Sequence, residues 1–283
     1  MHPHIIMPSP QLRSVVERYE YWDFGKVTNF SNRLMAMPCI ENGILFSFYN
    51  AENIILKSEL IDYESLPATA LMSTLTSPLY NLNTNSNNGI RVMFHRGLLP
   101  KLFNFSMKSF QNMPVDSSYE FDKDLHFLYE KIGESQDYRY WIIQIENYLL
   151  KKLRFISFDK NIFDYINQIF IQEGYSNSIQ NLADKLGMSV RHFNRLVNKE
   201  LGFSLSELIR VHRFNRVLMH FESSDKINLT NVAHQFGYYD QSHFNREFKQ
   251  MTLQTPKEYL RSTNKCFIHT QEDILYPGGF ACW

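Results

Sequence analysis

Cysteine and glycine are both scarce in this sequence, and each shortage excludes classes of protein. The 283 residues include three cysteines, at positions 39, 266 and 282. They are too few and too widely spaced for a disulfide scaffold or a four-cysteine zinc site, and they fit a reducing, cytoplasmic setting. Among 11 glycines there is no G-x-G-x-x-G, G-x-x-x-x-G-K or G-x-S-x-G pattern, and H-E-x-x-H is also missing. The common nucleotide-binding, serine-hydrolase and zinc-protease signatures are therefore excluded.

Long apolar runs and an excess of charge are missing as well. No apolar run approaches the ~18 residues of a membrane span, and the first residues lack a signal-peptide stretch, so no membrane association is expected. The 29 basic residues balance 29 acidic ones, and this zero net charge by itself argues against a nucleic-acid partner. Hydrophobic residues make up 44% of the chain, which is enough for a sizeable core, and the length fits two domains.

The first 130 residues indicate a small β-rich domain. Turn-forming residues separate four short runs rich in Ile, Leu, Phe and Tyr, which we interpret as strands at 44–49, 53–56, 70–74 and 90–94. Such spacing favours a sandwich or barrel, followed by a short helix at Leu98–Phe105. A second, amphipathic helix is predicted over Trp141–Leu153. That helix leads toward the second domain, and packing on its own domain is at least as good an interpretation as a role in dimerisation.

The strongest feature of the sequence is an internal repeat. The tetrapeptide His-Phe-Asn-Arg at 192–195 recurs 51 residues later at 243–246, and the similarity extends in both directions. Each copy predicts a helix, a tight turn and a second helix. Gly187 and Gly237 are placed to end the first helix of each copy, and Ser189 and Asp240 to cap the second. The second turn contains one extra residue. This composition is typical of a helix-turn-helix.

The second helix of each copy has a polar face suited to DNA. Advancing by about 100° per residue separates apolar positions from a polar sector in both helices. Asparagine and arginine make paired contacts with adenine and guanine edges, and lysine suits phosphates. The predicted DNA-contacting residues are Arg191, Asn194, Arg195 and Asn198 in the first copy and Gln241, Ser242, Asn245, Arg246 and Lys249 in the second.

Helical periodicity continues around and between the two copies. A helix is expected over Ile162–Phe170, before Gly174, and another of about 16 residues over Ser206–Phe221. The latter would be roughly 24 Å long. A rod of that length could hold the reading helices, starting near Val190 and Gln241, close to the ~34 Å spacing of successive major grooves.

Over about residues 159–262 the sequence resembles the AraC/XylS family of bacterial transcription regulators. The most specific match is the run from Gly237 to Lys249, G-Y-Y-D-Q-S-H-F-N-R-E-F-K, with Thr255-Pro256 after it. The resemblance implies tandem helix-turn-helix modules that bind promoter DNA and usually activate transcription, with RNA polymerase as a partner. It also carries DNA contacts over to Arg191, Asn194, Arg195, Gln241, Ser242, Asn245 and Arg246.

One position departs from the family pattern. Leu253 stands where the family usually has glycine, and a non-glycine residue at positive φ costs about 1 kcal/mol, so the turn is expected to differ locally. The β-rich part is similar in layout to the sensor domains of some family members, which implies a small-molecule effector or a homodimer without naming a ligand.

No catalytic, cofactor or metal site emerges from the sequence. The DNA-repair alkyltransferases related to this family need Pro-Cys-His-Arg, whereas Ile40 and Glu41 follow Cys39 here, so Cys39 is expected to be a buried small residue. His95 and His126 stand apart, so no metal site is expected. An N-terminal domain that acts as an enzyme, or purely as a tether, is the alternative to a sensor.

The predicted fold is therefore α+β: a β-rich sensor domain with helices, and an all-α tandem helix-turn-helix domain. The expected boundaries are 1–135 for the sensor, 136–158 for the connecting helix, 159–264 for the DNA-binding domain and 265–283 for a tail. Charge counted by segment removes the objection to DNA. Residues 185–216 hold seven basic and two acidic residues, a net of +5, and residues 241–265 hold five and two, a net of +3.

Overall fold

The computed structural model describes most of the two predicted domains. The described residues are 3–23, 34–40, 42–49, 55–57, 64–65, 68–72, 75–81, 87–110, 112, 115–116, 122–154, 179–224 and 226–261. The helix predicted at 162–170 and the tail at 265–283 lie outside them.

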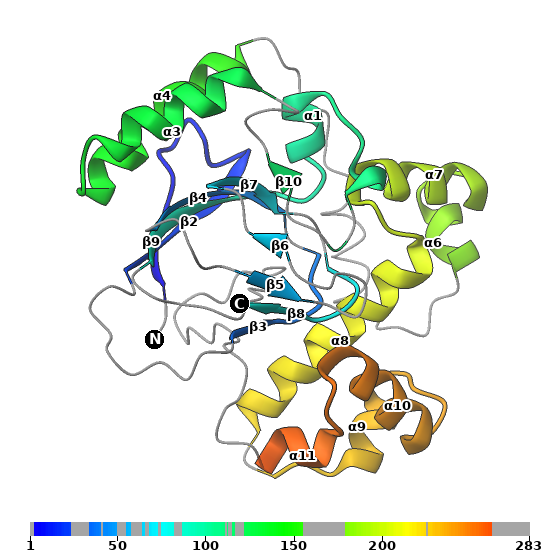
Figure 1. Ribbon diagram of the computed structural model, residues 1–283. Helices are drawn as coiled ribbons and strands as arrows, with labels where there is room; N and C mark the ends of the chain where they lie inside the picture. The colour runs from blue at the N-terminus through cyan, green and yellow to red at the C-terminus, as the bar shows by residue number, and fades with distance from the viewer. Residues whose placement is uncertain are drawn as a thin grey trace.

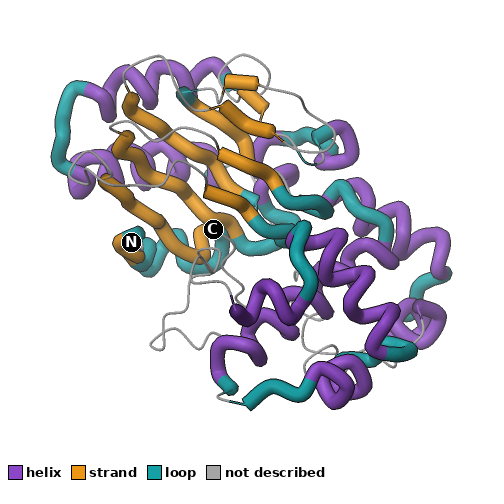
Figure 2. The backbone as a smooth tube through the Cα atoms, turned by 60° about the horizontal axis from the view of Figure 1, so that its bottom comes forward, coloured by secondary structure: helices purple, strands orange, loops and turns teal. Residues whose placement is uncertain are grey.

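Two antiparallel sheets form the N-terminal part (Figures 1 and 2). The larger has six strands, in the order β1 (His4–Ile6), β2 (Val16–Asp23), β9 (Asn87–Phe94), β4 (Gly43–Tyr49), β7 (Thr69–Met72) and β10 (Val115–Asp116). The smaller has four, in the order β3 (Leu34–Ala36), β8 (Leu79–Asn81), β5 (Ile55–Lys57) and β6 (Glu64–Ser65). The β-rich prediction is confirmed, and strands lie at or across all four of the predicted runs.

Helices cover one face of the six-stranded sheet. Figure 1 shows α3 (Lys123–Gly133) and α4 (Tyr138–Leu153) lying over it, with α1 (Leu99–Phe103) and the 3₁₀ turn η1 (Met107–Ser109) at one end. Trp141 and Ile145 of α4 are buried with Tyr19 of β2 in a common apolar core. The amphipathic helix therefore packs on its own sheet.

Several elements were not identified from the sequence, and β2 shows why. Its face opposite the helices carries two charged side chains, Arg18 and Glu20, which are 6% and 0% exposed. Glu20 accepts a hydrogen bond from Arg18 Nε at 2.6 Å and pairs with Arg91 of β9. Burial of these charges is possible because they pair with one another. The alternation that identifies a strand is interrupted at the adjacent charges Glu17 and Arg18, where the register with β9 shifts. The other elements that were missed are β1, β3, β6, β8, β10 and α3.

The C-terminal part is entirely helical in the described residues. Its helices are α6 (Ile179–Lys185), α7 (Val190–Leu201), α8 (Leu205–Ser223), α9 (Leu229–Gln235), α10 (Gln241–Thr252) and α11 (Pro256–Arg261). Figure 1 shows α8 running from the pair α6–α7 to the group α9–α11. The predicted α+β fold class, with a β-rich part and an all-α tandem helix-turn-helix part, is confirmed.

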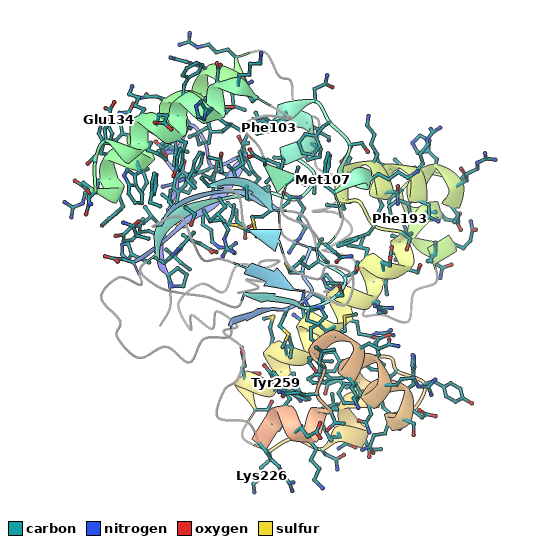
Figure 3. The ribbon with its side chains drawn as sticks, in the orientation of Figure 1. Phe103, Met107, Glu134, Phe193, Lys226 and Tyr259 are labelled. Atoms are coloured by element: carbon teal, nitrogen blue, oxygen red, sulfur yellow. The ribbon has the colours of Figure 1, made fainter. Side chains whose placement is uncertain are left out.

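The two parts touch one another. Met37 and Ile40, which precede β4, are buried in the same apolar cluster as Phe193 of α7 and Phe214 of α8. The turn η1 packs against α7, and Figure 3 shows Met107 of that turn beside this helix. The N-terminal part therefore contacts the first helix-turn-helix unit directly.

Candidate nucleic-acid interface

The two helix-turn-helix units share a turn glycine and a side-chain cap, although the second turn is one residue longer. The turn glycines, Gly187 and Gly237, have φ of 64° and 73°, in the left-handed region that glycine adopts without strain. Ser189 caps α7 by accepting a hydrogen bond from His192 N at 3.2 Å, and Asp240 caps α10 in the same way. The predicted starts of both reading helices, Val190 and Gln241, are confirmed.

In the first unit, α7 turns its apolar side chains inward and its arginines outward. Phe193 and Val197 are fully buried, whereas Arg191 and Arg195 are exposed. Asn194 lies at the boundary between these faces, and its Oδ1 accepts a hydrogen bond from Leu205 N at 3.0 Å. This asparagine therefore supports the start of α8. Asn198 of the same helix is half-buried.

In the second unit, α10 repeats the arrangement. Ser242, Arg246 and Lys249 are exposed, and the opposite face is buried. Asn245 lies at the boundary, like its counterpart Asn194, and its Oδ1 is buried without a hydrogen-bond partner among the described residues. Gln241 is half-buried and accepts a hydrogen bond from Thr230 Oγ1 of α9 at 2.8 Å. Among the predicted DNA-contacting residues, the exposed ones are therefore the arginines of both helices together with Ser242 and Lys249 of α10.

The sequence interpretation left three residues near these surfaces without a role. His192 is exposed in the first turn of α7, and its Nδ1 lies 3.4 Å from Arg195 Nη2. Its counterpart His243 lies in the first turn of α10. Tyr239, in the second turn, is 89% exposed. The repeat of histidine at both positions was the available signal for the first two.

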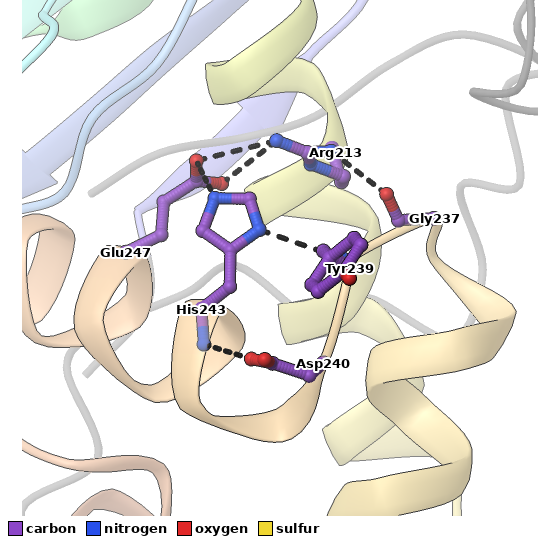
Figure 4. Close-up of polar contacts among 6 residues, drawn as sticks. All are labelled: Arg213, Gly237, Tyr239, Asp240, His243 and Glu247. Carbon is purple, nitrogen blue, oxygen red and sulfur yellow. Dashed lines mark hydrogen bonds and ion pairs between the residues drawn. The ribbon is translucent and has the colours of Figure 1, made fainter.

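A buried ion pair fastens the second unit to α8 (Figure 4). Arg213 Nη2 lies 3.2 Å from both carboxylate oxygens of Glu247, and its Nη1 donates to Gly237 O at 3.2 Å. The guanidinium carbon is 4.3 Å from the centre of the Tyr238 ring. Arg213 therefore joins α8, the turn and α10 at one point, in the paired and stacked geometry that favours arginine.

The first unit is held by the N-terminal part instead. Lys101 Nζ of α1 lies 3.5 Å from Oε1 of Glu200, near the end of α7. Ser106 Oγ, just before η1, donates to Lys199 O at 3.4 Å. Burial raises the pKa of the Glu200 carboxyl, and the charges of Lys101 and Lys199 oppose that rise.

The connecting helix α8 is longer than predicted and starts with a capping box. Ser204 accepts from Glu207 N at 3.3 Å, while Glu207 Oε2 accepts from Ser204 N at 2.7 Å. Its 19 residues correspond to roughly 28 Å. Phe214 and Phe221 of α8 pack against Phe248 of α10, so the rod and the second reading helix share a core.

The expectation of a different turn at Leu253 was wrong. Leu253 closes α10 with φ of 60°, and its N–H donates to Lys249 O at 2.8 Å. Gly202 closes α7 at the equivalent position with φ of 80°. The ends of α7 and α10 therefore have the same form. Leu253 adopts the left-handed conformation that Gly202 adopts in the first unit.

The part of the chain that the structure describes has neither a cluster of metal-binding side chains nor a helix that could span a membrane. There, no three His, Cys, Asp or Glu side chains form a group that could hold a metal ion. Within the same residues no helix is both long and apolar enough to cross a membrane. Cys39 is buried as expected, and His95 Nε2 lies 2.9 Å from Arg13 O.

The helix-turn-helix region also matches known proteins in sequence. Residues 182–262 match the family model described as "Helix-turn-helix domain". The chain is 28% identical over 96 residues, 34% of its length, to an uncharacterized HTH-type transcriptional regulator of Staphylococcus aureus, and 27% identical over 93 residues, 33% of its length, to the invasion protein InvF of Salmonella typhimurium. These matches span 12% and 43% of those relatives. Among solved structures, ToxT from Vibrio cholerae aligns with 86% of this chain and 97% of its own, at 12% identity and a TM-score of 0.47.

Proposed function

We propose that the chain is a sequence-specific DNA-binding transcriptional regulator of the AraC type, on the premise that residues 182–262 match a helix-turn-helix family model. The observation that carries the proposal is the matched placement of Arg195 and Arg246. Both are exposed, and each is the sixth residue of its helix, counted from equivalent caps. Such a pair is suited to guanine edges in two successive major grooves.

The exposed members of the predicted contact set are the ones we propose for direct contact with double-stranded DNA. Arg191, Arg195, Ser242 and Arg246 face solvent on the reading helices, and Lys249 lies where a phosphate contact is expected. Asn198 and Gln241 are half-buried and would contact DNA from the edge of each helix. The amide groups of Asn194 and Asn245 lie deeper, and we propose that they mainly position these helices.

The rest of the molecule fits control of transcription. We propose that the chain acts at promoters with RNA polymerase as an activator, and that its β-rich part senses a small molecule or forms a homodimer. The contacts of η1 and α1 with α7 give such a signal a direct route to the first unit. Sedimentation of the full chain tests the dimer, and transcription from a bound promoter with purified RNA polymerase tests activation.

Substitution of the two arginines tests DNA recognition itself. The probe is a duplex selected by the 283-residue chain from a randomised pool. Arg195→Ala and Arg246→Ala are each expected to lose about 1–3 kcal/mol of binding free energy in a gel-shift titration. Arg139→Ala, at an exposed arginine of α4, is the control and should bind as the unsubstituted chain does. Unchanged affinity in both arginine variants would overturn this assignment of the arginines, and failure of the chain to enrich any duplex from the pool would overturn the proposal.

A further inference from the structure

Two adjacent tyrosines in the second turn have opposite surroundings. Tyr238 is 4% exposed and lies under the Arg213 guanidinium, whereas Tyr239 is 89% exposed. Single exposed apolar groups are ordinary on protein surfaces. Tyr239 differs from them because the backbone that carries it is held on both sides, next to the start of a reading helix.

Two hydrogen bonds hold that backbone, and a third caps the helix that follows it (Figure 4). Arg213 holds the carbonyl oxygen of Gly237, the N–H of Tyr239 donates to His243 Nδ1 at 3.5 Å, and the side chain of Asp240 caps α10 by accepting from His243 N at 2.6 Å. The side chain of Tyr239 therefore extends from a turn that is already ordered. An ordered turn reduces the entropy lost when an aromatic side chain meets a partner.

The first unit has no counterpart of Tyr239. The turn there passes from Gly187 through a single residue, Met188, to the cap Ser189, and Met188 is half-buried against the core. The second turn holds two residues between Gly237 and the cap Asp240. The extra residue adds an exposed aromatic ring beside α10 and nothing equivalent beside α7.

We propose that Tyr239 contacts the sugar-phosphate backbone of DNA at the edge of the groove that α10 enters. The ring would pack against a deoxyribose and the hydroxyl would donate to a phosphate oxygen. The turn before a reading helix lies near the groove edge, where contacts position the protein without reading bases. This inference rests on the proposed function, and it makes the second unit the one with the additional anchor.

Binding of paired variants to two DNAs tests the contact. With the full chain, Tyr239→Ala is expected to lower affinity about tenfold, and Tyr239→Phe about threefold because it removes only the hydrogen bond. The losses should be equal for the selected duplex and for an unrelated duplex, because the backbone is common to both. The slope of log affinity against log salt should not change, since no cation is removed, whereas Lys249→Ala should reduce it by about 1. Phe127→Ala, at a 69% exposed aromatic of α3, is the matched control and should change none of these values.

The outcomes separate this inference from the function beneath it. If Arg195→Ala and Arg246→Ala weaken binding while Tyr239→Ala does not, the backbone contact is overturned and the proposed function stands. A loss confined to the selected duplex would also overturn it, because Tyr239 would then read bases. If the full chain enriches no duplex from the randomised pool, the DNA-binding function itself fails.

Discussion

The two helix-turn-helix units have nearly the same local geometry but are held in place differently. In the second unit, Glu247 of the reading helix is fastened to Arg213 of α8, so the support lies within the helical part. In the first, Glu200 and Lys199 of the reading helix contact Lys101 and Ser106 of the N-terminal part. The second unit is therefore fastened by an ion pair within the helical part, whereas the first is fastened by polar contacts with the neighbouring part of the chain as well.

This difference shows that the sequence repeat preserves the turn glycines and the helix caps, but not the residues that contact each reading helix. Glu247 falls opposite Leu196 in the 51-residue register, so the residue that forms the buried ion pair of the second unit is apolar in the first. A signal that moves the N-terminal part would therefore act on the first reading helix directly, through Lys101 and Ser106. Three substitution experiments, from the largest expected effect to the smallest, test this division.

The largest effect is expected from acid, at His212 on α8. This histidine is 3% exposed, and burial together with the positive charges of Arg96 and Arg216 lowers its pKa to about 3. Below pH ~6.5 the unfolded chain takes up a proton at this residue and the folded chain does not. The contribution of neutral His212 to stability is therefore complete above pH ~6.5. Below that pH the free energy of unfolding falls by up to about 1.4 kcal/mol per pH unit, down to about pH 3. Urea unfolding across this range measures the loss.

His212→Gln isolates that contribution. Its stability should fall less steeply with acid than that of the unsubstituted chain, whereas His126→Gln, at an exposed position, should leave the profile unchanged. Arg96 precedes α1, so His212 lies where α8 meets the N-terminal part. Identical profiles for His212→Gln and the unsubstituted chain would contradict a buried, neutral histidine at that contact.

A smaller loss is expected from removing the anchor of the second unit. Glu247→Ala leaves Arg213 without its carboxylate in a site where the two side chains are 14% and 8% exposed, which should cost about 3 kcal/mol of stability. Thermal or urea unfolding measures the loss of stability. Footprinting on the selected duplex shows which part of the DNA site loses protection. Protection should weaken in the half of the site bound by α10.

Glu247→Gln is the conservative control, because it keeps an acceptor for Arg213 and should lose less. Lys101→Ala removes the partner of Glu200 and should weaken protection in the other half of the site. If Glu247→Ala and Lys101→Ala each weakened protection equally in both halves of the DNA site, the two units would share one support. The proposed difference between the units would then be wrong.

The smallest effects are expected at the two helix ends, and they should have opposite signs. Gly202→Ala places a side chain at φ of 80° and should cost about 1 kcal/mol. Leu253→Gly relieves the same strain in the second unit. Because it also removes some packing and makes the unfolded chain more flexible, the expected gain in stability is below about 1 kcal/mol. Urea unfolding of both variants gives the signs, and a loss at both sites would show that Leu253 is held mainly by its packing.

The helical part was predicted from the sequence far better than the sheets. Its signals are local: Ser189 and Gly187 lie within three residues of the atoms that they control, and the 51-residue repeat provides an internal check. Strand β2 depends instead on β9, about 70 residues away, and on the pairing of Arg18 with Glu20 inside the fold. The supports of the reading helices were missed for the same reason, because Lys101 and Glu200 are joined only by tertiary structure.

The repeated capping box has a consequence for the order in which the chain folds. Thr255 and Glu258 exchange at the start of α11 the hydrogen bonds that Ser204 and Glu207 exchange at the start of α8. Contacts closed within four residues need almost no loop closure, whereas pairing Tyr19 with Val92 closes a loop of more than 70 residues. Local contacts form fastest. The helix starts can therefore order while the sheet is still open, and contacts between the N-terminal part and the first unit, such as Lys101 with Glu200, close later.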